Sequence, residues 1–227
     1  MVPRISTRRL LNLDAGSEAH PWRGATLCLP ALQRAAWVLR HAQHEPLLQH
    51  CIQALLSLLQ WECTVMAGSD PSLPLFLALD NLVASGLLEA THDLLEEYTH
   101  LTRSSALDWE APPGETEVPP PRSFLRTTHC QLALRLADSL VITLSNLSLG
   151  RSCCPMFLLS AVLEVLGLGQ RDEDAGLVAA VTAVLTTMAD TLPEGAGASE
   201  LGPQLQRLLT RDLDVDIRSV LERLTKL

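Results

Sequence analysis

Leucine occupies 48 of the 227 positions, and most leucines recur at helical spacing in segments that open near proline and close at glycine. Leucine is a strong helix former, whereas the β-branched and aromatic residues that favour strands are scarce by comparison. With 47% hydrophobic residues, the chain has enough apolar surface to fold, which excludes intrinsic disorder. The sequence therefore predicts an all-α protein with a leucine-rich core.

Apolar periodicity, proline starts and glycine stops divide the chain into about nine helices and no strand. We predict helices over residues 31–44, 46–62, 73–85, 87–102, 123–149, 155–166, 176–190, 199–209 and 214–227. Pro30, Pro46 and Pro155 stand at helix starts, where the N–H that proline lacks has no intrahelical acceptor. Gly86 and Gly150 end the third and the fifth of these helices.

Two segments fall outside this helical pattern. Residues 1–25 show no sustained periodicity, so we expect a poorly ordered N-terminal segment. Residues 104–122 are acidic and hold five prolines, a composition that buries little surface, so we expect a mobile loop there. Residues 26–227 are otherwise predicted to form a single helical-repeat domain, in which Ser123 caps the helix that follows the loop.

Helix lengths and apolar faces favour a right-handed α-solenoid over a closed bundle. The helices of a bundle have matched lengths and narrow apolar stripes, but the predicted helices differ in length. Residues 46–62 are apolar except for one polar stripe, and a helix of this kind needs neighbours on most sides. The stripe consists of Gln49, Gln53, Ser57 and Gln60. Stacked helical pairs supply such neighbours, and an irregular closed helical bundle is the alternative.

Two local patterns resemble the armadillo/HEAT superfamily of helical repeats. Residues 208–218 (Leu-Leu-Thr-Arg-Asp-Leu-Asp-Val-Asp-Ile-Arg) are similar to a HEAT turn, in which an Asp-rich turn leads into an aliphatic residue and Arg. Residues 79–82 and 144–147 (Leu-Asp-Asn-Leu and Leu-Ser-Asn-Leu) are similar to the Leu-x-Asn-Leu of an armadillo third helix. The resemblance implies an α-solenoid that binds other proteins, with partner-binding roles for Asn81, Asn146 and Arg218.

The last predicted helix, residues 214–227, carries a capping signal and an apolar side that needs cover. Asp214 or Asp216 is expected to cap its free N–H groups, and Arg218 to reach an acid on a neighbouring turn. The apolar side is formed by Ile217, Val220, Leu221 and Leu224. It requires cover from the preceding helices or from a missing repeat or partner. A fragment or splice form of a longer repeat protein is therefore one interpretation.

The formal net charge of −9 argues against direct nucleic-acid binding, which needs clustered basic residues. The uncharged apolar runs are shorter than the roughly 20 residues of a transmembrane helix. The six cysteines, scattered except for one vicinal pair and without a C-x-x-C motif, fit free thiols in a reducing compartment. We therefore expect a cytoplasmic or nuclear protein with other proteins as partners, no membrane contact, and an oligomeric state left open.

Motifs for catalysis are missing from the sequence, which has no P-loop, no G-x-S-x-G and no dinucleotide-binding fingerprint. Glu89-x-x-His92 and Glu97-x-x-His100 match the spacing of di-iron ligands. Both pairs stand on the polar side of one helix, whereas a di-iron site needs two facing helices. We expect a solvated face there, and no metal or other cofactor.

Three further groups carry ligand or nucleophile types without the spacing that a known site requires. They are His41, His44, His50 and Cys51 at one turn, Asp212, Asp214 and Asp216 at another, and the vicinal pair Cys153 and Cys154. We interpret all of them as ordinary turn or surface residues.

The expected function is that of a non-enzymatic scaffold or adaptor, which binds other proteins through the surface of its stacked helices. Two alternatives come from other classes. One is an all-α enzyme or metal/redox protein that uses a His/Cys site, and the other is a bundle-type regulatory subunit.

Overall fold

The computed structural model describes residues 27–66, 74–105, 122, 124–148, 155–168, 175–192, 201–211 and 213–226. Every regular element in these ranges is a helix, which confirms the predicted all-α class. The helices are α2 (Leu29–His41), α3 (Glu45–Met66), α4 (Pro74–Ala84), α5 (Leu87–Ser105), α6 (Thr127–Leu147), α7 (Met156–Gly167), α8 (Ala175–Thr191), α9 (Gly202–Leu209) and α10 (Val215–Leu224). None of these described helices combines the length and apolar character that a membrane span needs.

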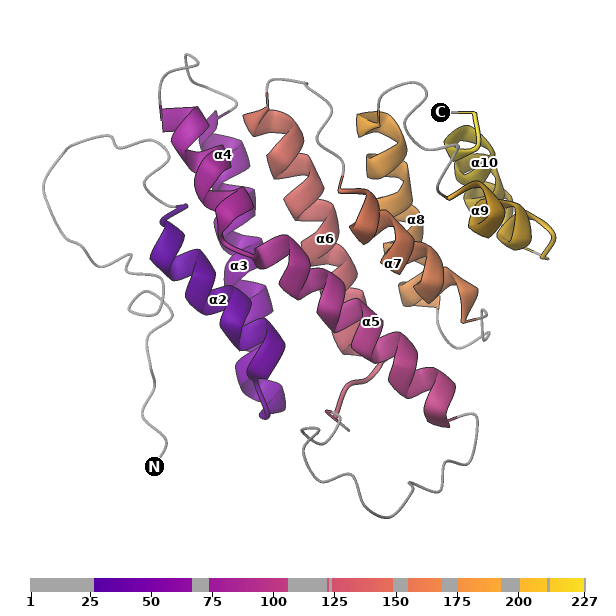
Figure 1. The fold of residues 1–227 in the computed structure, drawn as a ribbon, viewed down its shortest axis with the longest axis horizontal. Coiled ribbons are helices and arrows are strands. Elements are labelled where there is room, and N and C mark those ends of the chain that lie inside the picture. The colour runs from indigo at the N-terminus through magenta and orange to yellow at the C-terminus, as the bar shows by residue number, and fades with distance from the viewer. Residues whose placement is uncertain are drawn as a thin grey trace, which may run out of the picture.

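The helices lie in two rows (Figure 1). Along the first row, which is nearer the viewer, α2 contacts α5, α5 contacts α7, and α7 contacts α9. Along the second row, α3 contacts α6, α6 contacts α8, and α8 contacts α10. Each first-row helix also contacts the second-row helix that follows it in the sequence. The short helix α4 lies beside α2, α5 and α6.

The core fills the space between the two rows and forms one apolar cluster that extends from Leu27 to Leu224. α6 is central to it, because this helix contacts α3, α4, α5 and α8. Leu134, Leu136 and Leu140 of α6 are completely buried. Burying one leucine side chain stabilises a fold by about 1.5–3 kcal/mol, so the leucine layer between the rows is the main source of stability.

Two signals in the sequence mark helix ends correctly. Gly86 adopts a φ of 72° between α4 and α5, a backbone conformation that glycine adopts without strain. Asp214 caps α10, because its side chain accepts the backbone N–H of Asp216 at 2.9 Å.

Several other helix ends differ from the prediction, and α3 continues to Met66, four residues beyond its predicted end. We expect a helix from residue 123 with Ser123 as its cap, but α6 begins at Thr127 after the N-cap residue Arg126. The sequence predicts the end of α5 at residue 102, but this helix continues through Ser105. The predicted N-terminal segment 1–25 and residues 106–121 of the predicted loop 104–122 lie outside the described residues. The predicted bounds of this loop are wrong at both ends, because residues 104 and 105 belong to α5 and Arg122 is buried.

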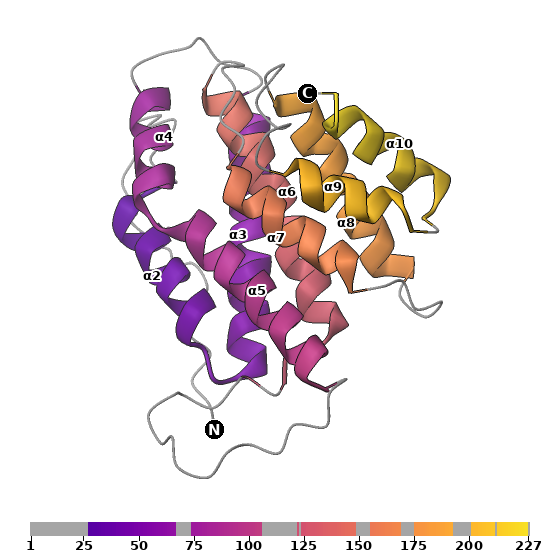
Figure 2. The ribbon, with the colours of Figure 1, turned by 45° about the vertical axis from the view of Figure 1, so that its right-hand side comes forward.

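The last helix, α10, has its apolar side covered within the chain (Figure 2). Ile217, Leu221 and Leu224 are at most 1% exposed, and the helices that α10 contacts are α8 and α9. Of the two sources of cover considered above, the preceding helices therefore supply it.

Replacing Leu134 by alanine is expected to lower the free energy of unfolding by about 2–5 kcal/mol, because it opens a cavity in the middle of the core. Chemical denaturation of the purified chain measures this loss. The neighbouring Arg135 is exposed, so Arg135→Ala should change the free energy of unfolding by less than about 0.5 kcal/mol. Equal effects of the two substitutions would contradict the placement of α6.

Candidate functional site

The outer side of the first row is charged, and α5 supplies most of the charges. Leu87, Leu94 and Leu95 hold one side of this helix in the core. The other side carries titratable side chains spaced three and four residues apart, which places them on one face. They are Glu89, His92, Asp93, Glu96, Glu97, His100 and Arg103. The predicted polar side of this helix is thus the outer surface of the first row.

Two ion pairs connect α5 to its neighbours in the first row. Arg40 Nε of α2 donates to Asp93 Oδ2 at 2.7 Å. Arg103 Nη1 of α5 lies 3.3 Å from Glu164 Oε2 of α7. All four side chains are substantially exposed, so each pair contributes at most about 1 kcal/mol to stability. Their main effect is to orient the side chains, Asp93 in particular.

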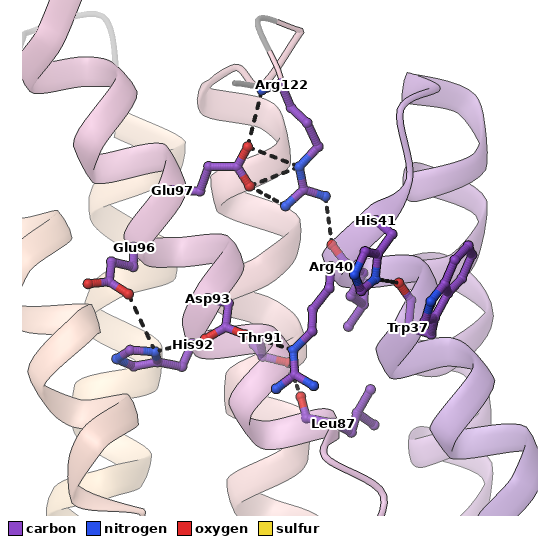
Figure 3. Close-up of polar contacts among 11 residues, drawn as sticks. Trp37, Arg40, His41, Leu87, Thr91, His92, Asp93, Glu96, Glu97 and Arg122 are labelled. Atoms are coloured by element: carbon purple, nitrogen blue, oxygen red, sulfur yellow. Dashed lines mark hydrogen bonds and ion pairs between the residues drawn. The ribbon is translucent and has the colours of Figure 1, made fainter. Parts of the chain in front are cut away.

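Beside Arg40, one histidine and two carboxylates meet on the surface of α5 (Figure 3). His92 Nδ1 lies 3.5 Å from Asp93 Oδ1 and 4.0 Å from Glu96 Oε2. The His92 ring packs edge-on against Phe157 of α7, with 5.6 Å between the ring centroids. Within the described part of the chain, no other three histidine, cysteine or acidic residues bring their donor atoms within 4.8 Å of one another. We name His92, Asp93 and Glu96 the α5 cluster.

A buried arginine fixes the chain just before α6 (Figure 3). Arg122 is 4% exposed, and its Nε donates to both oxygens of Glu97 on α5, at 3.0 and 2.8 Å. Its Nη1 donates to the carbonyl oxygen of Leu39 on α2, at 2.6 Å. Because the guanidinium is shielded from water, its charge depends on Glu97 for compensation. This contact joins α2, α5 and the start of α6 at one point.

The variant Glu97→Gln is expected to lower the free energy of unfolding by about 3 kcal/mol, because it leaves the charge of Arg122 buried without a counter-ion. Glu164→Gln serves as the matched control, since it removes a carboxylate from an exposed pair and should cost at most about 1 kcal/mol. Urea denaturation of both variants gives the comparison. A small loss in both variants would show that Arg122 is not buried in solution.

His129 is a second buried polar residue at the start of α6, with 1% of its side chain exposed. Its Nδ1 accepts the backbone N–H of Arg126 at 3.1 Å, so the neutral ring carries its proton on Nε2. Nε2 faces Glu45 Oε1 of α3 at 3.4 Å, and Phe124 packs edge-on against the ring. Burial lowers the pKa of His129 below its ordinary value of 6.5; Glu45 opposes this shift and Arg126 adds to it.

Because folding lowers the pKa of His129, the unfolded chain binds more protons at this residue than the folded chain does. The stability that neutral His129 contributes is therefore present above pH 6.5 and is lost as the pH falls below that value. His129→Gln is expected to flatten the decline in unfolding free energy between about pH 6.5 and pH 5, measured by urea denaturation across that range. His41→Gln changes an exposed histidine and should keep the wild-type decline. Equal flattening by both variants would refute the role given to His129.

On the outer side of the second row, α3, α6 and α8 expose few charges, whereas α10 exposes Asp216, Arg218, Glu222 and Arg223. Each of α3, α6 and α8 buries its other sides against neighbouring helices, which leaves one exposed side per helix. Toward the start of α3, Glu45, Leu47 and His50 are exposed. Farther along the helices, the exposed residues include Gln53, Ser57 and Gln60 on α3, Arg135, Ile142 and Asn146 on α6, and Ala179, Ala183 and Asp190 on α8. We name this set the second-row surface. Amide, hydroxyl and small side chains predominate in it, and Ile142 is 38% exposed near its middle.

The three residues predicted to bind a partner lie on three different helices. Asn81 is half-buried on α4, and its Nδ2 donates to the carbonyl oxygen of Leu27 at 2.9 Å, so this amide nitrogen is engaged within the chain. Asn146 is exposed and belongs to the second-row surface. Arg218 of α10 donates through Nη2 to the carbonyl oxygen of Arg211 at 3.1 Å. Among the described residues, no ion pair joins Arg218 to an acid. Partner binding by these residues stays a prediction.

The predicted turn group around Cys51 forms no metal-ligand cluster among the described residues. Cys51 Sγ donates to the carbonyl oxygen of Ala35 at 3.8 Å, and burial raises the pKa of this thiol to about 12, which suppresses its reactivity. His41 stacks on Trp37 and donates through Nδ1 to its carbonyl oxygen at 2.9 Å. Asp212, Cys153 and Cys154 lie outside the described residues.

The sequence does not reveal which polar residues the fold brings together. The Glu-x-x-His spacing pairs each histidine of α5 with the glutamate three residues before it, whereas the structure places His92 beside Asp93 and Glu96. The spacing of four between His92 and Glu96 was the available signal. The sequence around Arg122 and His129 carries no signal of their contacts, because their partners come from distant helices.

Comparisons with known proteins add no relative to this description. No protein-family model, no curated protein and no solved structure matches the chain. The fold defines the protein as all-helical, with two packed rows of helices. Its two outer surfaces are the places where a function can be sought.

Proposed function

We propose that this chain is a non-enzymatic scaffold or adaptor that binds a partner protein through the second-row surface, as an armadillo/HEAT-like right-handed α-solenoid. The observation that carries the proposal is the contrast between the two outer sides. The outer side of α5 carries charged groups, several of them in ion pairs, although Trp37 and Phe157 are exposed elsewhere on the first row. The second-row surface on α3, α6 and α8 holds only two charged residues, Arg135 and Asp190, beside the exposed Ile142.

The composition of the second-row surface suits a protein interface. Charged groups are depleted at the centres of such interfaces, because removing them from water is costly. Ile142 offers an apolar anchor, and the amide of the exposed Gln53 offers both donors and an acceptor. Ala179 and Ala183 have short side chains, so a partner can approach α8 closely.

The dimensions of this surface also suit a partner protein. α6 has 21 residues and is therefore roughly 30 Å long. Three adjacent helices about 10 Å apart extend over roughly 25 Å. The product, roughly 750 Å², is close to the roughly 800 Å² that each partner buries in a standard interface. The core holds all three helices in place, which lowers the entropy cost of binding.

The location proposed for this scaffold is the cytoplasm or the nucleus. Cys28, Cys51 and Cys130 are free thiols in the structure, and free thiols persist in a reducing compartment. Asn146 lies on the second-row surface, so binding through this surface gives it a role in partner contact.

Charge placed at the middle of the second-row surface is expected to abolish partner binding. The test variant carries Ile142→Glu and Ala183→Glu, and the matched control carries Gln33→Glu and Gln206→Glu on exposed first-row positions. Quantitative mass spectrometry of proteins that copurify with each tagged chain should find at least one partner that is reduced tenfold or more by the test variant only. Far-UV circular dichroism checks that both variants fold.

Two results would contradict the proposed function. One is a set of copurifying proteins that the test variant retains and the first-row control loses. The other is a wild-type chain that recovers no protein beyond those recovered by an unrelated tagged control.

A further inference from the structure

We propose that the α5 cluster binds one divalent transition-metal ion of the zinc type, held by His92 Nδ1, Asp93 Oδ1 and Glu96 Oε2. This site goes beyond the proposed function and is independent of it, because the cluster lies on the first row and the scaffold surface on the second. It also departs from the solvated face and the absence of metal that the sequence predicts.

The distances within the cluster are close to those of a metal site. Zinc bonds to histidine nitrogen and carboxylate oxygen are about 2.0–2.2 Å long, which places neighbouring donors of a tetrahedral ion roughly 3.4 Å apart. His92 Nδ1 is 3.5 Å from Asp93 Oδ1 and 4.0 Å from Glu96 Oε2. All three donor atoms lie within 4.8 Å of one another. A side-chain rotation that moves Glu96 by roughly 1 Å would complete the three contacts.

Residues of two other helices hold the ligands in place. Arg40 of α2 binds Oδ2 of Asp93, which leaves Oδ1 facing His92 (Figure 3). Phe157 of α7 packs against the edge of the His92 ring. Partners of this kind, which orient a ligand through its second atom or its ring, are a regular feature of metal sites. Acidic residues on a solvated face of a single helix do not require orienting partners from other helices, such as Arg40 and Phe157.

The donor set favours a transition metal over calcium or magnesium. Calcium and magnesium prefer oxygen ligands alone, whereas an imidazole nitrogen with carboxylates suits zinc and its neighbours. A further histidine nitrogen, His100 Nε2, lies 3.9 Å from Glu96 Oε1. The remaining coordination positions would be open to water.

The test is a zinc titration of the chelator-treated full chain by isothermal titration calorimetry. The expected result is one zinc ion per chain, with an affinity that Glu96→Gln and His92→Gln each lower at least tenfold. Glu89→Gln is the matched control, because it removes the same charge from the same helix outside the cluster, and it should keep the wild-type affinity. Glu96 is about half exposed, so Glu96→Gln should keep the thermal midpoint even if His92→Gln weakens the packing on Phe157.

A cobalt titration distinguishes this site from binding by cysteine. Cobalt at the α5 cluster should give visible absorption without a thiolate-to-cobalt charge-transfer band, and Cys153→Ser with Cys154→Ser should leave the spectrum unchanged. Three outcomes would overturn the proposal. They are a thiolate band that disappears in the double cysteine variant, an affinity that neither Glu96→Gln nor His92→Gln changes, and zinc binding that appears only at millimolar concentrations.

Discussion

The mutual burial of leucines between the two rows of helices is the interaction on which the rest of the structure depends. Neither row could keep its apolar side in water, and each covers the other along the whole described length. Since the core is built entirely between the rows, the outer sides are released from packing. Their side chains can therefore differ, with charges along α5 of the first row and mostly amide, hydroxyl and small groups on α3, α6 and α8 of the second. The division of the molecule into two unlike surfaces follows from this single constraint.

The polar contacts whose loss would cost the most stability are concentrated at the start of α6. Arg122 is buried against Glu97 and Leu39, and the nearby His129 is buried between α3 and the residues before α6. The other ion pairs of the described chain are exposed or half exposed and contribute little. Charge and hydrogen bonding thus hold one point of the fold in place, namely the residues that lead into α6. Elsewhere the fold relies on apolar packing.

The sequence predicts the features of this molecule that depend on near neighbours. Helical periodicity gives the all-α class, Gly86 marks the break between α4 and α5, and Asp214 marks the start of α10. Each of these signals acts within a few residues, so no knowledge of the fold is needed to use it.

Contacts between distant residues could not be predicted in the same way. In the sequence, Arg122 looks like the last residue of a loop. Its hydrogen-bond acceptors, on Glu97 and Leu39, lie 25 and 83 positions away, so no local pattern reveals them. Asn81 looks like a surface residue until α4 places it beside Leu27. The orientation of Asp93, which completes the α5 cluster, depends on Arg40 of another helix. In each case the packing of the two rows determines which residues meet, and a single sequence carries no record of that packing.

Hydrogen–deuterium exchange of the chain, free and bound to a partner recovered with it, tests most directly whether the second row is the binding side. If the partner binds the second-row surface, hydrogen exchange should slow on binding in peptides from α3, α6 and α8, and the exchange rates of peptides from α2 and α5 should stay unchanged. Slower exchange confined to α2, α5 and α7 would contradict this prediction, because the partner would then occupy the charged side of the molecule.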